Sequence, residues 1–357
     1  MSVTCYVAPR LTAEETARWR GFLATCPAAQ YMQDPDWVEV ERRGEGMRAR
    51  RPYFFWCEQD GHVCLTAIGI RRGLPVPGRV FWEFDNGPNV HDPDVLDAWL
   101  GWLIERIEPE TARLTLQPAH VLDEVGDQME TVLDAHGLLR RRKAGIWSTL
   151  LVDLTPPEDD ILASFHRKTR KTLRQSADHG IVIREEDDPV GWSALCDLSA
   201  EMAARARVRP IDCSYVEAIS RVWLDGGRRG TVLVARHDGN AIAAFILIMY
   251  NSVATGPVMP STRRFGDLPA SHLLTWEAMR LAKAHGCTHW DSGGYSLSVH
   301  PGEPVWGINE FKRGFAPKAA PLKLVSVHER IFSPLVVGSA TTVRRLQMWR
   351  RLRAAGD

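Results

Sequence analysis

The residues best suited to chemistry lie in one C-terminal block, THWDSGGYSLSVHPGEPVWGINEFKRGF, which runs from Thr288 to Phe315. Its first residues predict a strand that ends at Asp291, and the pair Gly293-Gly294 then lets the backbone turn sharply. His289 and Asp291 stand two residues apart on that strand, so their side chains share a face. This arrangement is compatible with an acid–base pair.

Two positively charged features are candidates for binding or catalysis, one inside this block and one in a basic stretch before it. Lys312 follows Phe311, and by pattern alone it fits a lysine whose ammonium reaches solvent beside a buried ring. The stretch FHRKTRKTLRQSAD predicts a helix with a strongly basic face, which could either contact phosphates or simply be solvated. The basic residues of that helix are Arg167, Lys168, Arg170, Lys171 and Arg174.

Motifs of other catalytic classes are missing from the sequence. It contains no G-x-S-x-G, no H-E-x-x-H and no Walker-type glycine loop. An isolated histidine such as His272 is more often structural than catalytic. The sequence therefore gives no support for a serine hydrolase, a zinc protease or a P-loop enzyme, and we predict no metal ligands.

The elements that position these residues recur along the chain at an offset of 178 residues. The turn signal Asp60-Gly61 recurs as Asp238-Gly239, in each case between runs with a strand pattern. Each half then supplies an amphipathic helix and a further strand. The predicted helices carry apolar stripes over 96–107 and 273–282, and the predicted strands cover 113–116 and 288–291.

The resulting order of elements in each half is similar to the acetyltransferase (GNAT) fold. We therefore predict an α/β protein (α+β, with mixed sheets) of two tandem GNAT-like domains related by internal duplication. Thr155-Pro156-Pro157 marks the expected boundary. The predicted domains are 1–154 and 155–320, followed by a C-terminal strand and helix over 321–357 that pack back on the first domain.

Several motifs together resemble the FemAB-like family, peptidoglycan-bridge aminoacyltransferases that use aminoacyl-tRNA. That family shows a strand ending in D-x-G-G, followed by G-[IL]-x-x-F-K-x-x-F, which matches Asp291 to Gly294 and Gly307 to Phe315. The basic helix resembles the family's S-x-x-x-R-x-x-I-R-x-A helix. In the first half, Asn86-Gly87-Pro88-Asn89 resembles the family's R-G-P-V turn, with Asn86 in place of the arginine.

The resemblance implies an amide-forming transfer of an activated amino acid to an amine, without a covalent enzyme intermediate. Lys312 is similar in position to the family's catalytic lysine, whose ammonium would face the tetrahedral oxyanion. The resemblance also implies roles in contacting substrate and tRNA. The substrate candidates are Trp37, Arg42 (or Arg43), Arg205, Tyr250, Asp291, Tyr295 and Phe311, and the tRNA candidates are Arg167, Lys168, Arg170 and Lys171.

Two other functions are compatible with the sequence. An acyl-CoA-dependent N-acyltransferase on the same fold would cradle pyrophosphate near Arg263 and Gly266, although Leu268 stands where a small residue is expected. A non-catalytic relative that binds nucleic acid or a protein partner is the second alternative. The sequence predicts no cofactor beyond the aminoacyl-tRNA co-substrate, and it leaves the amino acid, the acceptor and the oligomeric state open.

Composition indicates an ordinary soluble globular protein. The 357 residues carry no net charge, so any contact with nucleic acid must come from a local patch. The seven cysteines form no C-x-x-C pair, and reduced thiols in the cytoplasm are the simplest expectation. We expect no signal peptide, and the longest apolar run, Ala241 to Tyr250, is too short to span a bilayer.

Overall fold

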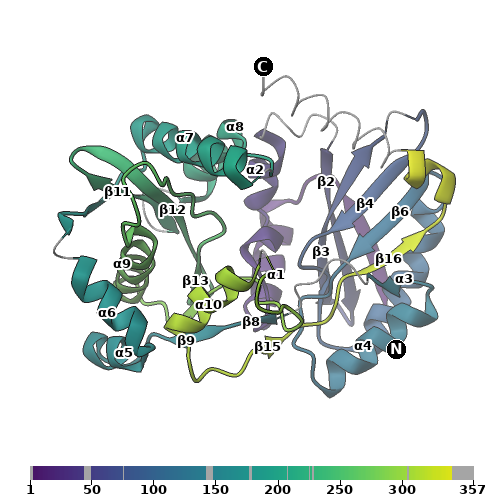
Figure 1. Cartoon of the computed structure of the whole chain (residues 1–357). Helices are drawn as coiled ribbons and strands as arrows, with labels where there is room; N and C mark the ends of the chain where they lie inside the picture. The colour runs from purple at the N-terminus through teal and green to yellow at the C-terminus, as the bar shows by residue number, and fades with distance from the viewer. Residues whose placement is uncertain are drawn as a thin grey trace. The chain divides into compact units, whose positions relative to one another are not determined.

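The computed structural model describes residues 3–43, 50–74, 76–141, 148–176, 179–206, 208–224, 226, 229–303 and 305–339 (Figure 1). The chain divides into two compact units. Unit 1 comprises Met1–Arg42, Met47–Ala144 and Leu324–Asp357, and unit 2 comprises Arg43–Gly46 and Gly145–Lys323.

Unit 1 is built on a mixed sheet with the strand order β1-β2-β3-β4-β6-β16-β7, from which β5 branches by pairing with β3. The stripe predicted over 96–107 forms α3, whose first turn is capped by the Asp92 carboxylate. Its apolar face packs into a core rich in tryptophan, with Trp99 fully buried. The strands and helices are β1 (Thr4–Ala8), α1 (Ala13–Leu23), η1 (Tyr31–Gln33), α2 (Trp37–Arg43), β2 (Arg50–Gln59), β3 (His62–Gly73), β4 (Val80–Phe84), β5 (Asn89–Val90), α3 (Pro93–Ile107), β6 (Thr111–Leu116), α4 (Glu124–Ala135), β7 (Leu139–Arg140) and β16 (His328–Ile331).

Unit 2 contains a six-stranded sheet in the order β10-β11-β12-β13-β14-β9, and the short strands β8 and β15 pair separately. Strands β13 and β14 are parallel, and α9 packs on β11 and β12. The elements are β8 (Ser148–Thr149), β9 (Leu151–Asp153), α5 (Glu158–Ser164), α6 (Arg167–Ser176), β10 (Val182–Glu185), α7 (Pro189–Ala206), α8 (Cys213–Ala218), η4 (Ile219–Leu224), β11 (Gly230–His237), β12 (Asn240–Tyr250), β13 (Val253–Thr255), α9 (Ala270–Ala284), β14 (His289–Asp291), α10 (Trp306–Phe315) and β15 (Leu322–Lys323).

The internal repeat predicted from the sequence is present in both sheets. The hairpins β2–β3 and β11–β12 turn at Asp60 and Asp238, whose φ angles are 50° and 49°. Each hairpin also has a register shift at the equivalent place, between Cys57 and Glu58 in unit 1 and between Ala235 and Arg236 in unit 2. A β-bulge kept at the same offset is a specific backbone feature. It supports descent of both halves from one ancestral unit.

The segments that join the halves differ from the expected bounds. Strand β9 pairs with β14, so residues up to Asp153 belong to the sheet of unit 2, whereas we expected the first domain to extend to Leu154. Strand β16 pairs with β6 in unit 1. The helix predicted within the C-terminal segment 321–357 lies largely outside the described residues, which end at residue 339. Cys196 and Cys213 are joined as a disulfide, which departs from the expectation that all cysteines are reduced thiols.

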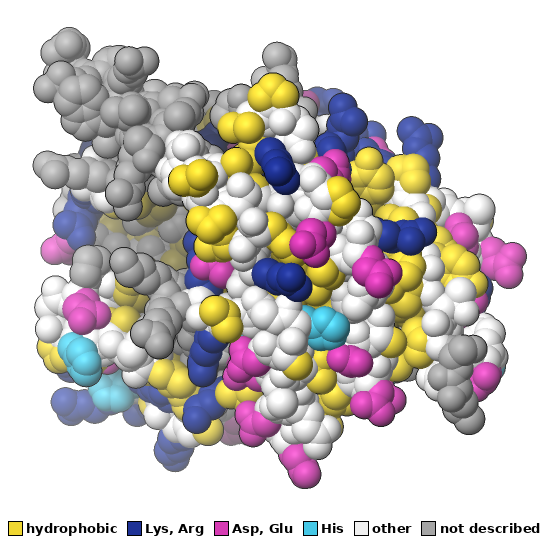
Figure 2. Space-filling model, turned by 90° about the vertical axis from the view of Figure 1, so that its right-hand side faces the viewer, with side chains coloured by type: hydrophobic (Ala, Val, Ile, Leu, Met, Phe, Trp, Pro, Cys, Tyr) yellow, Lys and Arg dark blue, Asp and Glu magenta, His cyan; other side chains and the backbone are white. Residues whose placement is uncertain are grey.

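Surface charge is mixed where it can be seen. On the described part of the face in Figure 2, basic and acidic side chains are interspersed among apolar and uncharged ones. This distribution agrees with the zero net charge of the chain. None of the described helices combines the length and apolar composition that a membrane span requires.

Candidate functional site

The candidate site lies in unit 2, in the loop that leads from β14 to α10. Asp291, the last residue of β14, accepts two hydrogen bonds on its Oδ1 atom, one from the Thr149 hydroxyl and one of 2.7 Å from the Gly293 backbone N–H. Gly293 has a φ of 68°, which is unfavourable for any residue with a side chain. A Cβ atom at Gly293 would lie 3.9 Å from Lys312 Nζ. The turn therefore brings the chain close to the lysine.

Lys312 projects from α10 back to this loop. Its Nζ donates a hydrogen bond of 2.5 Å to the Gly294 carbonyl. An ammonium has three donors, and the described residues occupy one of them, which leaves two for a substrate. Burial lowers the pKa of Lys312, and the nearby Asp291 carboxylate opposes that shift. Burial raises the pKa of Asp291, while its hydrogen bonds from Thr149 and Gly293 and the charge of Lys312 act in the other direction.

The loop is held rigid from both sides. The Asn309 side chain in α10 donates to the Ser296 carbonyl at 2.7 Å and accepts from the Ser296 N–H at 3.3 Å. The Tyr295 N–H donates to the Ser148 carbonyl at 2.7 Å, so β8 fixes the other end of the loop. Asn309 and Ser296 are both buried. These bonds fix the backbone between the glycine pair and α10.

Tyr295 is held by α10 as well as by β8. Arg313 donates a 3.1 Å hydrogen bond to the Tyr295 hydroxyl, and its guanidinium lies 4.9 Å from the centroid of the tyrosine ring. The same guanidinium donates to the Ala319 carbonyl at 2.6 Å. Tyr295 therefore lies in the loop that joins Asp291 of β14 to α10, the helix of Lys312, and its hydroxyl is already bonded to Arg313.

Phe311 has mainly a packing role. Its ring lies 4.9 Å from the His272 ring of α9 and 5.3 Å from the ring of Phe315. Burial lowers the pKa of His272, which favours its neutral form in this aromatic cluster. The contact between Phe311 and α9 sets the orientation of α10 and hence the position of Lys312.

The basic helix α6 packs directly against α10. A Cβ atom at Gly314 would lie 2.5 Å from the Thr169 hydroxyl oxygen, so only glycine permits this close approach. The Gly314 carbonyl also accepts a 2.9 Å bond from the His166 N–H. The basic face of α6 is thereby fixed to the helix that carries Lys312.

The tRNA candidates on α6 fall into two groups. Arg170 donates to the carbonyls of Ala163 and Phe165 at 2.9 and 2.5 Å, so it stabilises the end of α5. The other candidates are exposed, and no ion pair joins them to a described carboxylate. These are Arg167, Lys168 and Lys171, together with Arg174.

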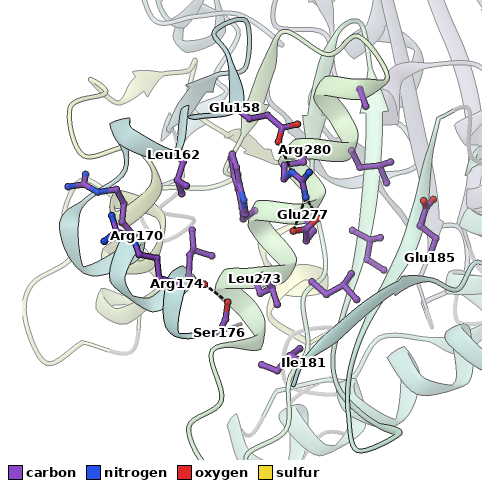
Figure 3. Close-up of a pocket in the computed structure, with 16 residues that line it drawn as sticks. Glu158, Leu162, Arg170, Arg174, Ser176, Ile181, Glu185, Leu273, Glu277 and Arg280 are labelled. Atoms are coloured by element: carbon purple, nitrogen blue, oxygen red, sulfur yellow. Dashed lines mark hydrogen bonds and ion pairs between the residues drawn. The ribbon is translucent and has the colours of Figure 1, made fainter. Parts of the chain in front are cut away.

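Residues of α6, α9 and β10 line a cavity of about 730 Å³. Figure 3 shows the side chains that line it. Its walls combine apolar side chains, Trp276 among them, with charged ones. Much of its charge is already neutralised, because Arg280 pairs with Glu158 at 2.7 Å and with Glu277 at 3.0 Å. Lys312 does not line this cavity.

The remaining substrate candidates have contacts elsewhere. In unit 1, Trp37 is buried with its ring 4.6 Å from that of Tyr31, and Arg42 donates to the Pro9 carbonyl at 2.6 Å besides pairing with Glu39. In unit 2, Arg205 and Tyr250 have contacts with residues outside the loop. Arg205 donates to the Ser261 carbonyl at 3.1 Å, and the Tyr250 ring packs 5.9 Å from that of Trp223.

Three residues of the site were missed from the sequence: Thr149, Asn309 and Arg313. Thr149 precedes Asp291 by 142 residues and carries no motif of its own. Asn309 and Arg313 lie inside the F-K motif region, where a buried amide at the start of α10 could have been recognised from its position three residues before Lys312. Among the described residues, no cluster of His, Cys, Asp and Glu is suited to hold a metal ion.

Comparison with known proteins confirms the fold. Residues 163–313 match the model of an acetyltransferase (GNAT) domain. The crystal structure of FemX superposes with a TM-score of 0.76 at 16% identity, covering 93% of this chain and 97% of that one. The chain has a FemX-like fold. This confirms the predicted tandem GNAT architecture, and the domain match agrees with the predicted enzyme class, an acyltransferase.

Other solved structures share this fold at lower similarity. A tandem GNAT protein from the clavulanic acid biosynthesis pathway has a TM-score of 0.59 at 15% identity, and covers 93% of this chain and 99% of its own. The C-terminal domain of a putative lysylphosphatidylglycerol synthetase from Agrobacterium fabrum has a TM-score of 0.55 at 17% identity, with 93% and 95% covered. No curated protein sequence matches the chain.

Proposed function

We propose that this FemX-like protein is an aminoacyltransferase that moves an amino acid from aminoacyl-tRNA to an amine. The observation that carries the proposal is the partly buried ammonium of Lys312, held at 2.5 Å from the Gly294 carbonyl where the D-x-G-G turn meets α10. Such a charge, oriented before the reaction begins, is suited to a carbonyl that becomes an oxyanion. FemX and a lysylphosphatidylglycerol synthetase domain are among the proteins of similar fold.

The chemistry requires no nucleophile from the protein. An aminoacyl ester is already activated, and an amine attacks its carbonyl directly to give a tetrahedral intermediate. Lys312 would stabilise that intermediate. One well-placed donor lowers the activation free energy of such a reaction by about 3 to 4 kcal/mol. The acceptor is an amine on a cell-wall precursor or on a small metabolite, and the reaction takes place in the cytoplasm.

The donor's phosphates would bind along the exposed face of α6. Lys168 and Lys171 are one turn apart on that helix and face solvent. Because α6 is fixed to α10 through Thr169 and Gly314, phosphates bound there stay at a defined distance from Lys312. Salt-dependent binding of RNA is the expected consequence.

Coenzyme A is the competing donor. The turn before α9 contains the expected Arg263 and Gly266, but Pro269 occupies the helix N-cap and has no N–H to offer a pyrophosphate. The Leu268 side chain packs on the core of unit 2, so it does not crowd the turn as the sequence suggested. The missing donor at Pro269 makes this turn less suited to coenzyme A.

Two parallel assays separate the donors. In one, the protein is incubated with total tRNA charged with radiolabelled amino acids and with two acceptors, a lysine-containing cell-wall precursor and a deproteinised metabolite extract. In the other, radiolabelled acetyl-CoA replaces the charged tRNA. We expect label to move from tRNA to an acceptor and to stay at background with acetyl-CoA. Transfer from acetyl-CoA alone would overturn the proposal.

A further inference from the structure

We propose that Asp291 is the catalytic base of this reaction, which takes the proton of the attacking amine, and that Thr149 is the residue that positions it. This inference rests on the proposed aminoacyl transfer. It assigns a role that the sequence left open and separates Asp291 from His289, whose ring instead contacts the Thr288 hydroxyl at 3.0 Å.

The hydrogen bonds of the carboxylate are unevenly distributed. The Thr149 hydroxyl and the Gly293 backbone N–H both donate hydrogen bonds to Asp291 Oδ1. The distance from the Gly293 nitrogen to Oδ1 is 2.7 Å. The other carboxylate oxygen accepts no hydrogen bond from the described residues. One oxygen is thus fixed by the protein, and the other is left for a substrate proton.

Thr149 is itself well oriented for this task. Its hydroxyl oxygen lies 3.1 Å from the Gly293 carbonyl and next to Asp291, so one side chain ties together both ends of the turn. Strand β8, which carries Thr149, is paired in register with β15, where Thr149 faces Leu322. The positioning group is therefore held by regular backbone pairing.

The charged surroundings of Asp291 are simple. Its neighbours on the flanking strands are Leu151 in β9 and Thr255 in β13, and both are uncharged. Lys312 of α10 is the charged group whose field acts on it, although the two side chains form no ion pair. Burial raises the pKa of Asp291, which makes its carboxylate a stronger base than an exposed aspartate.

The transfer of the amino acid from the ester to the amine requires no further reactant. The amine nitrogen forms the C–N bond to the ester carbon, and the carbonyl π electrons move to the oxygen, where the Lys312 ammonium faces the negative charge. One amine proton passes to the free oxygen of Asp291. When the intermediate collapses, the ester C–O bond breaks and Asp291 returns that proton to the departing ribose hydroxyl.

The first test is Asp291→Asn. The amide oxygen can accept the same two bonds from Thr149 and Gly293, so the variant keeps the turn while it loses the basic oxygen. We expect kcat/KM for transfer from charged tRNA to fall about 100-fold or more, with little change in tRNA affinity. Transfer within a few-fold of the wild-type rate would overturn the assignment.

The second test compares Thr149→Val with Thr149→Ser across pH. Thr149→Val removes a hydrogen-bond donor from the Asp291 carboxylate, which raises the pKa of Asp291 further. The acidic limb of the pH–rate profile should therefore move to higher pH in the valine variant. The serine variant keeps the hydroxyl and should keep the wild-type limb. A carbon-13 NMR titration of Asp291 measures the same shift without activity, and an unmoved limb or an unmoved titration would contradict the positioning role.

Failure of the inference is distinct from failure of the proposed function. If the wild-type protein transfers no amino acid from charged tRNA, the function is wrong. If it transfers and Asp291→Asn or Thr149→Val behaves like wild type, only the role of Asp291 and Thr149 is wrong.

Discussion

The two halves of the chain share a backbone plan, but they differ at the end of the strand that follows the long amphipathic helix, α3 in unit 1 and α9 in unit 2. In unit 1 that strand is β6, and the next residue, Gln117, uses its amide to bond the Val325 carbonyl at 3.0 Å. In unit 2 the strand is β14, and the next residues form the turn of Gly293 and Gly294 beside Lys312. In unit 1 the Gln117 side chain uses its amide to hold a neighbouring backbone segment. In unit 2 the equivalent turn instead holds the Lys312 ammonium in one orientation.

This difference shows how a duplicated fold can acquire one reactive site. The hairpins and their bulges are kept in both halves because they set the shape of the sheet. Among the described strand ends, a carboxylate and an ammonium are buried close to each other at the end of β14. These groups are Asp291 and Lys312, and burial shifts the pKa of each. The proposed function therefore assigns the chemistry to one loop of the shared scaffold.

The largest effect is expected from alanine substitutions at two glycines that both have positive φ angles. Gly293 and Gly239 have φ angles of 68° and 78°, but only Gly293 lies near Lys312. Alanine at either position should cost about 1 kcal/mol of stability. Only Gly293→Ala should also lower the transfer rate, by about 100-fold, because backbone strain at this turn shifts the Gly294 carbonyl that orients the Lys312 ammonium. Thermal unfolding and transfer assays on both variants measure this, and equal loss of activity would break the comparison.

A smaller effect is expected from the basic helix. Lys168→Glu with Lys171→Glu should weaken tRNA binding about tenfold and reduce the slope of log Kd against log salt by about 1.5. The matched control is Arg10→Glu with Arg106→Glu, which makes the same change in net charge at exposed positions of unit 1. Filter binding at several salt concentrations distinguishes the two pairs. Equal losses would mean that α6 has no specific role.

Much of the fold could be predicted because short stretches of sequence identify the repeated elements. The Asp-Gly turns and the apolar stripe of α3 specify their elements within a few residues. The boundary was less predictable, since β9 is a strand of three residues whose place is decided by pairing with β14. Local sequence does not encode that pairing.

The site was predicted in part for the same reason. Asp291, Tyr295 and Lys312 lie close together in sequence, and one loop brings them together in space. Thr149 could not be found, because its contact with Asp291 joins residues 142 apart. Arg170 was assigned to tRNA from its charge, but the structure commits its guanidinium to the carbonyls at the end of α5.

The most direct test of the account is the single-turnover rate of amino acid transfer for Lys312→Met, with Lys318→Met as control. Both variants remove one lysine charge, but Lys318 is exposed, whereas Lys312 is hydrogen-bonded to the Gly294 carbonyl of the glycine turn. We predict a fall of about 100- to 1000-fold for Lys312→Met alone, with unfolding temperatures close to wild type. Transfer by Lys312→Met at the rate of the control would contradict the central claim.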